Sequence, residues 1–151
     1  MFLQMRDHAL KIREGAAAIL ISTDGRLLLQ LRDDLPEVSD PGKIGLFGGA
    51  REGDESFLDC VMREVQEETS IYLPPERFAL IERYFGPDYW TPGGMRHSEI
   101  FVAYDVPIDQ MTVTEGTLKI IALDEIEHIH DMLAPYAKHA LDIFLRLARV
   151  S

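Results

Sequence analysis

Three glutamates in the segment 49–71 have a spacing that could support metal chemistry. Glu64, Glu67 and Glu68 occupy positions i, i+3 and i+4, which lie on one face of an α-helix. Like charges at these spacings repel by roughly 0.2–0.5 kcal/mol per pair, so the helix itself gains nothing from them. A hard cation such as Mg2+ or Mn2+ prefers carboxylate oxygens, water and substrate phosphates as ligands. The spacing therefore predicts a metal-binding face, with an ordinary solvated acidic face as the alternative.

The residues before these glutamates favour the metal-binding interpretation. Gly48 and Gly49 close a short apolar segment, and Glu55 stands six residues after Gly49. Arg63 follows Glu55 by eight residues and directly precedes the first of the three glutamates. Because each spacing restricts the next, the whole set is more specific than a short glutamate-rich motif.

Together these residues resemble the signature of the Nudix hydrolases, G-x5-E-x7-R-E-U-x-E-E-x-G-U, in which U is a bulky aliphatic residue. The signature positions filled here are Gly49, Glu55, Arg63, Glu64, Val65, Glu67, Glu68 and Ile71. Ser70 replaces the family's glycine at the end of the helix, where a left-handed backbone is common. We expect this serine to cost up to about 1 kcal/mol of cap stability and to remove no metal ligand. Phe47 also replaces the proline that usually precedes the two glycines.

The resemblance implies a metal centre of one to three Mg2+ or Mn2+ ions. It assigns Glu64, Glu67 and Glu68 as metal ligands, with the backbone carbonyl near Gly48 as a further ligand.

Arg63 and Glu55 are expected to form an ion pair beside this centre. The pair would orient the glutamates without binding metal itself. A surface salt bridge worth about 0–1 kcal/mol is the alternative.

The general base has three candidates, because Nudix families take it either from the signature helix or from a glutamate in a later loop. Glu64 is the candidate on the helix. Glu115, just before the last expected strand, is the candidate in a later loop. Glu99 is a competing carboxylate at the start of an apolar strand. The sequence leaves the choice open.

Four further residues are candidates for substrate contact. Trp90, in the loop expected over 86–95, could stack on a nucleobase, since stacking contributes about 1–3 kcal/mol per base. Packing onto the sheet or across a dimer interface is its alternative role. Arg32, Arg51 and Arg96 could bind phosphate or sugar, although arginines are usually solvated.

Length and composition fit one domain over residues 1–151, with 46% hydrophobic residues. The longest strongly apolar run, 16–21, is too short to cross a bilayer, and we expect neither a signal peptide nor a membrane span. Cys60 is the single cysteine and is expected to be a core residue in a reducing cytoplasm. The net charge of −11 disfavours a general electrostatic interaction with DNA or RNA polymers.

Hydrophobic patterning and turn signals predict an α/β fold. The expected strands are 16–22, 26–32, 44–47, 78–85, 99–106 and 117–123. The first two should pair as a hairpin across the Asp-Gly turn at 24–25. Ser56 can cap the glutamate helix, whose acidic face is expected toward solvent. A C-terminal helix beyond 124 should cover the other face of a mixed sheet. The result is a Nudix-type α/β/α sandwich, which the resemblance also implies.

The function predicted from the sequence is hydrolysis of a small nucleotide. The resemblance implies a metal-dependent pyrophosphohydrolase in which water attacks phosphorus in a nucleoside diphosphate derivative. The substrate classes left open are a nucleotide triphosphate, a nucleotide sugar, ADP-ribose and a dinucleotide. A nucleotide-sensing Nudix-like domain without catalysis is the alternative, although such a domain would be expected to have lost signature carboxylates. A homodimer is also plausible for this family.

Overall fold

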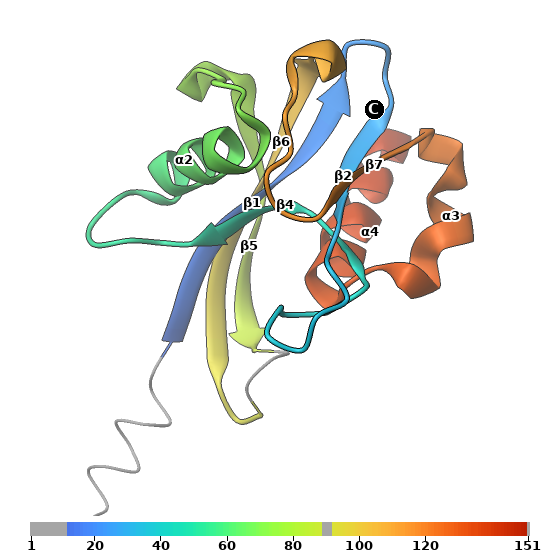
Figure 1. Cartoon of the computed structure of the whole chain (residues 1–151). Coiled ribbons are helices and arrows are strands. Elements are labelled where there is room, and N and C mark those ends of the chain that lie inside the picture. Colours follow the sequence, from blue (N-terminus) through green and yellow to red (C-terminus); the bar gives the residue numbers. More distant parts are fainter. Residues whose placement is uncertain (1–11, 89–91, 151) are drawn as a thin grey trace, which may run out of the picture.

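The computed structural model describes residues 12–88 and 92–150, arranged as one sheet between helices (Figure 1). The strands are β1 (Ile12–Ser22), β2 (Leu27–Leu31), β3 (Ile44–Gly45), β4 (Phe47–Ala50), β5 (Phe78–Pro87), β6 (Met95–Val106) and β7 (Thr117–Ile121). The α-helices are α2 (Phe57–Thr69), α3 (Ile126–Ile129) and α4 (Pro135–Val150). Short 3-10 turns are η1 (Pro75–Arg77), η2 (Ile108–Gln110), η3 (Leu123–Glu125) and η4 (His130–Met132).

The sheet is mixed. Its main order is β3-β2-β1-β6-β5, with β4 paired to β1 and β7 paired to β2. Strands β1 and β6 run parallel, whereas β1 pairs with β2 and with β4 in the antiparallel direction. The predicted hairpin is confirmed, since Leu20 pairs with Leu28 and Ile21 with Leu27.

Helices α2 and α4 cover opposite faces of this sheet (Figure 1). Successive side chains of a strand point to opposite faces. Leu20 of β1 packs in the core that contains Val65 of α2, whereas its neighbour Ile19 packs in the core that contains Leu141 of α4. The predicted α/β/α sandwich is therefore confirmed, and each face has its own apolar core.

Helix α2 begins and ends where the sequence indicates. The Ser56 side chain accepts a hydrogen bond from the Asp59 backbone N–H at 3.0 Å. Ser70 lies in the left-handed region, with φ 65°, and its N–H donates to the Gln66 carbonyl. Serine thus keeps the conformation in which glycine is usual. Cys60 is buried in the core of this face, as expected, and burial raises the pKa of its thiol to about 12.

Several predicted strand boundaries are wrong. The segment expected as one strand over 44–47 divides into β3 and β4, because β3 pairs with β2 and β4 pairs with β1. Strands β5 and β6 continue into the loop expected over 86–95, where Gly86 pairs with Arg96 and Pro87 with Met95. Glycine and proline indicated a loop there, but tertiary pairing extends the hairpin by several residues. Among the described residues, no helix is both long and apolar enough to cross a membrane.

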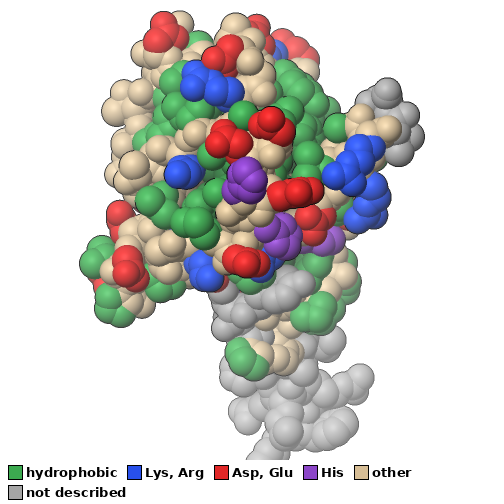
Figure 2. Space-filling model, turned by 90° about the vertical axis from the view of Figure 1, so that its right-hand side faces the viewer, with side chains coloured by type: hydrophobic (Ala, Val, Ile, Leu, Met, Phe, Trp, Pro, Cys, Tyr) green, Lys and Arg blue, Asp and Glu red, His purple; other side chains and the backbone are tan. Residues whose placement is uncertain are grey.

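Figure 2 shows the face formed by α3 and α4, where acidic, basic and histidine side chains lie among apolar ones. His130 and Asp142 approach each other here, with Nε2 and Oδ1 3.7 Å apart. A cavity of about 410 Å3 lies between the two helices, lined by Ile126, Glu127, His130, Asp142, Leu145, Arg146 and Arg149. It belongs to the α4 side of the molecule.

Candidate functional site

The glycines of β4 allow this strand to run close to both β1 and α2. A Cβ atom on Gly48 would lie 2.3 Å from the Ala16 carbonyl oxygen. A Cβ atom on Gly49 would lie 2.4 Å from the carboxyl carbon of Glu64. Larger residues would therefore separate the strand from its neighbours, and Gly49 lets the Glu64 carboxylate lie directly on the backbone.

Glu68 is buried, with 6% of its surface exposed. Its Oε1 accepts a hydrogen bond from the Gly48 backbone N–H at 2.8 Å, and its Oε2 accepts one from Gln30 Nε2 at 3.3 Å. Burial raises the pKa of this carboxyl to about 8, and the charges of Glu64 and Glu115 raise it further. The expectation that all three glutamates face solvent is wrong for Glu68, because this end of α2 lies against β4 and β2.

Arg63 gathers the other acidic side chains of the signature. Its Nη2 lies 2.7 Å from Glu55 Oε1, and its Nε lies 3.1 Å from Glu55 Oε2. Its Nη1 contacts Glu64 at 2.9 Å and Glu67 at 3.3 Å. The hydrogen bonds from Arg63 hold the pKa of Glu55 at about 2. The expected ion pair between Arg63 and Glu55 is thus present, and its orienting role stays a prediction.

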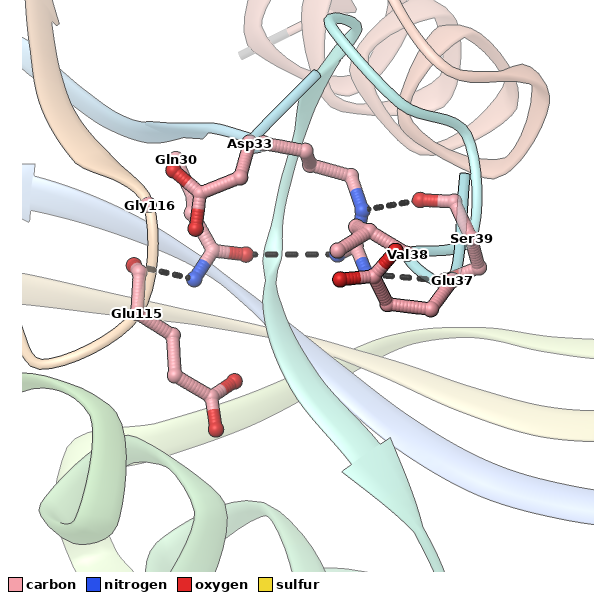
Figure 3. Close-up of a pocket in the computed structure, with 8 residues that line it drawn as sticks. Gln30, Asp33, Glu37, Val38, Ser39, Glu115 and Gly116 are labelled. Carbon is pink, nitrogen blue, oxygen red and sulfur yellow. Dashed lines mark hydrogen bonds between the residues drawn. The ribbon is translucent and has the colours of Figure 1, made fainter. Parts of the chain in front are cut away.

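The loop 111–116 brings a fourth glutamate to the same place. Thr112 and Thr114 donate their backbone N–H groups to the carbonyls of Thr69 and Glu68, at 2.9 and 3.2 Å. These bonds use carbonyls at the C-terminal end of α2, which have no partner within the helix. The side chain of Glu115 then points toward α2 (Figure 3). Burial is the main cause of the raised pKa of Glu64, to which the charges of Glu67 and Glu115 also contribute.

A cavity of about 410 Å3 opens beside Glu115 (Figure 3). Its lining is mostly polar and comes from Gln30, Arg32, Asp33, Glu37, Val38, Ser39, Glu115 and Gly116. Arg32 donates from Nη2 to the Ser39 hydroxyl at 2.7 Å and from Nη1 to Gln30 Oε1 at 3.3 Å. Of the arginines predicted to contact substrate, Arg32 is the one that lines this cavity.

Arg51 and Arg96 are not among the residues that line this cavity. Arg51 donates to Glu14 at 2.7 Å and to the carbonyl of Glu55 at 3.0 Å, on the N-terminal side of α2. The guanidinium carbon of Arg96 lies 4.2 Å from the ring centre of Tyr136 on α4, so this arginine is on the opposite face from α2. Burial lowers the pKa of Arg96.

The remaining candidates are Glu99 and Trp90. Glu99 contacts Arg83 of the neighbouring strand at 3.4 Å. Trp90 lies outside the described residues.

Sequence reasoning missed Gln30. It interrupts the apolar run Leu27–Leu31 at a position that alternation places on the α2 face. A single polar residue in a buried strand needs a hydrogen-bond partner, and that requirement is the signal that could have identified it.

The glutamates of this site carry the oxygen ligands that suit a divalent metal ion. Carboxylates are the ligands that Mg2+ and Mn2+ prefer, and the charges of Glu64, Glu68 and Glu115 interact with one another. Over residues 12–88 and 92–150, no three such groups already converge in a metal-binding arrangement. Arg63 donates a hydrogen bond to Glu64, and Gly48 and Gln30 donate hydrogen bonds to Glu68.

Comparison with known proteins agrees with the signature. The sequence matches the NUDIX domain family over residues 11–144. The comparison with curated proteins gives no match. A MutT NUDIX hydrolase from Burkholderia pseudomallei has a similar structure, with a TM-score of 0.65 and 27% identity over 87% of this chain and 97% of that chain.

Two further structures share the fold at lower identity. A MutT protein from Methanosarcina mazei Go1 has a TM-score of 0.72 and 23% identity over 91% of this chain and 94% of that chain. The NUDIX domain of Shewanella oneidensis NrtR, complexed with ADP ribose, has a TM-score of 0.71 and 17% identity over 93% of this chain and 90% of that chain. Because the family match covers most of the sequence, this chain belongs to the Nudix hydrolase family.

Proposed function

We propose that this Nudix hydrolase is a metal-dependent pyrophosphohydrolase that cleaves the diphosphate linkage of a nucleoside diphosphate derivative. The observation that carries this proposal is that Glu64 and Glu68 of α2 feel each other's charge or that of Glu115 in the loop 111–116, and that the charge of Glu67 also acts on Glu64. Carboxylates this close together repel an anionic diphosphate, so cations must lie between the carboxylates and the diphosphate if it is to bind here. The retained carboxylates favour catalysis over nucleotide sensing.

Glu64, Glu67 and Glu68, together with the carbonyl of Gly48, would hold one to three Mg2+ or Mn2+ ions. Bound divalent ions supply charge neutralisation on the phosphate oxygens and lower the pKa of water. The chain supplies a rigid platform, because Glu68 is buried against β4 and Arg63 contacts both Glu64 and Glu67.

Glu115 is the preferred general base. Its backbone is fixed by the hydrogen bond from Gln30 to its carbonyl at 2.8 Å, while its side chain is exposed and points toward α2. Glu64 contacts Arg63, and Glu99 contacts Arg83 on β5. Of the three candidates, Glu115 therefore has the greatest freedom to turn toward a water beside the scissile phosphorus and accept its proton.

The group attached to the diphosphate would occupy the cavity lined by Arg32 and Ser39, which lies next to Glu115. Candidate substrates are nucleotide triphosphates, nucleotide sugars, ADP-ribose and dinucleotides. The structure of the Shewanella domain with ADP ribose supports including that compound. Several further expectations stay predictions. They are substrate binding by Arg51, Arg96 and Trp90, a homodimer, a cytoplasmic location and a single domain over 1–151.

Turnover of a substrate panel tests this function. The panel contains one representative of each candidate class, and phosphate or nucleotide release is measured with Mg2+ or Mn2+ and again with a chelator. We expect metal-dependent release of product from one class. Glu68→Gln should reduce kcat at least about 100-fold, because a metal ligand loses its charge.

Glu76→Gln is the matched control, since Glu76 is exposed in η1, and its kcat should equal that of the wild type. Turnover that continues unchanged in folded Glu68→Gln would contradict the assigned role of this glutamate. Tight binding of a nucleotide without product in Mn2+ would instead support a sensing domain.

A further inference from the structure

Gln30 is a buried amide between the glutamate site and the cavity beside it. It is 3% exposed and lies in β2, and its side chain makes three hydrogen bonds. The Nε2 atom donates to Glu68 Oε2 at 3.3 Å and to the Glu115 carbonyl at 2.8 Å. The Oε1 atom accepts from Arg32 Nη1 at 3.3 Å.

These partners fix the orientation of the amide. Nε2 of Gln30 donates to the Glu115 carbonyl, which can only accept, and to Glu68 Oε2, and its oxygen faces a guanidinium that can only donate. Rotating the amide by 180° would place Gln30 Oε1 against the oxygens of Glu68 and Glu115, and Gln30 Nε2 against Arg32 Nη1. Each of the three contacts therefore supports the other two.

We propose that Gln30 is a positioning residue through which Arg32 in the cavity wall holds Glu68 in the orientation needed for metal binding. The inference rests on the proposed function, because it takes Glu68 as a metal ligand. Figure 3 shows the hydrogen bond from Gln30 to the Glu115 carbonyl, and Arg32 Nη1 donates to the oxygen of the same amide. A group bound in the cavity and a metal held on α2 would thereby be coupled through one side chain.

The physical reason lies in the two oxygens of Glu68. Oε1 is held by the backbone of β4, so the hydrogen bond to Oε2 decides how the carboxylate turns about that point. Partners that hydrogen-bond to a metal ligand commonly change metal affinity 10–100-fold when they are removed. Arg32 acts indirectly. Its hydrogen bond to Gln30 Oε1 keeps the Gln30 N–H groups directed at Glu68 and Glu115.

Direct Mn2+ binding without substrate tests the coupling. Affinity is measured by titration calorimetry and by the electron paramagnetic resonance signal of free Mn2+. Gln30→Met should bind Mn2+ about tenfold more weakly than the wild type. Arg32→Met should cause a smaller loss in the wild-type background and no further loss in the Gln30→Met background, because the route from Arg32 to Glu68 is then already broken.

Leu29→Val is the control, since Leu29 is the neighbour of Gln30 in β2 and packs in the core of the opposite face. Its Mn2+ affinity should equal that of the wild type. Unchanged affinity in folded Gln30→Met overturns the proposal, and so does an Arg32→Met effect that persists unchanged without Gln30. If Gln30→Met fails to fold, unchanged affinity in Arg32→Met overturns it, and a loss supports it.

The same titration of Glu68→Gln separates the two proposals. If that variant binds Mn2+ like the wild type, the metal role in the proposed function fails. If it loses Mn2+ while Gln30→Met does not, only the positioning role of Gln30 fails.

Discussion

The two neighbouring glycines of β4 have different neighbours and therefore different roles. The backbone of Gly48 lies against the backbone of β1, where a Cβ atom would come within 2.3 Å of the Ala16 oxygen. Gly49 lies against the end of the Glu64 side chain, where a Cβ atom would come within 2.4 Å of the carboxyl carbon. A backbone neighbour cannot move without disturbing the sheet, whereas a carboxylate at the end of a side chain can rotate away.

Alanine at these two positions should separate stability from metal binding. Gly48→Ala should lower the free energy of unfolding by about 1–3 kcal/mol, the range for forcing extra atoms into a packed site. Gly49→Ala should change it by less than about 1 kcal/mol and weaken Mn2+ binding, because Glu64 must move. Urea unfolding and Mn2+ titration measure the two quantities. Wild-type Mn2+ affinity in Gly49→Ala would show that Glu64 does not need its contact with Gly49.

Residue spacing predicted part of this site. The i, i+3, i+4 pattern identified the three glutamates, and local spacing identified the partner of Arg63. The burial of Glu68 could not be predicted, because it depends on β2 and β4 packing against the end of α2. The role of Gln30 depends on contacts with residues 38 and 85 positions away in the sequence.

Local signals define the two ends of helix α2, which carries three of the glutamates. Helix α2 starts at the Ser56 cap and ends at Ser70 in the left-handed region. These signals are local in sequence, so the helix was predicted well. The division of 44–50 into β3 and β4 was not predicted, because it results from pairing with two different strands.

Ser70→Gly tests the cost of a side chain in the left-handed conformation. Glycine adopts φ 65° without strain, so we expect the free energy of unfolding to rise by up to about 1 kcal/mol. The 3.3 Å hydrogen bond from the Ser70 hydroxyl to the Thr112 carbonyl is lost, which reduces the gain. Thermal unfolding should then show a melting temperature about 2–4 °C higher at most.

Gln66→Gly in the same helix is the control for this change. Gln66 is exposed and helical, so glycine there should lower stability by about 1 kcal/mol. Opposite signs for the two glycine substitutions are therefore expected. A loss of stability in Ser70→Gly would mean that the hydroxyl bond to Thr112 outweighs the backbone strain.

At the scale of the whole molecule, the sheet separates two apolar cores. Alternation along β1 sends Leu20 to the α2 core and Ile19 to the α4 core. Periodicity in the sequence shows such alternation, so the sandwich could be predicted. The docking of the loop 111–116 on α2 could not, since its hydrogen bonds join residues more than 40 positions apart.

This separation predicts that damage to the α4 core leaves the metal site intact in the folded protein. Leu141 is fully buried in the α4 core, and Leu141→Ala should lower the free energy of unfolding by about 2–5 kcal/mol. Its Mn2+ affinity, measured where the variant is folded, should match that of the wild type. Leu147→Ala is the control, because Leu147 is 49% exposed on the same helix and should cost much less. Weaker Mn2+ binding in folded Leu141→Ala would show instead that the two cores are coupled through the sheet.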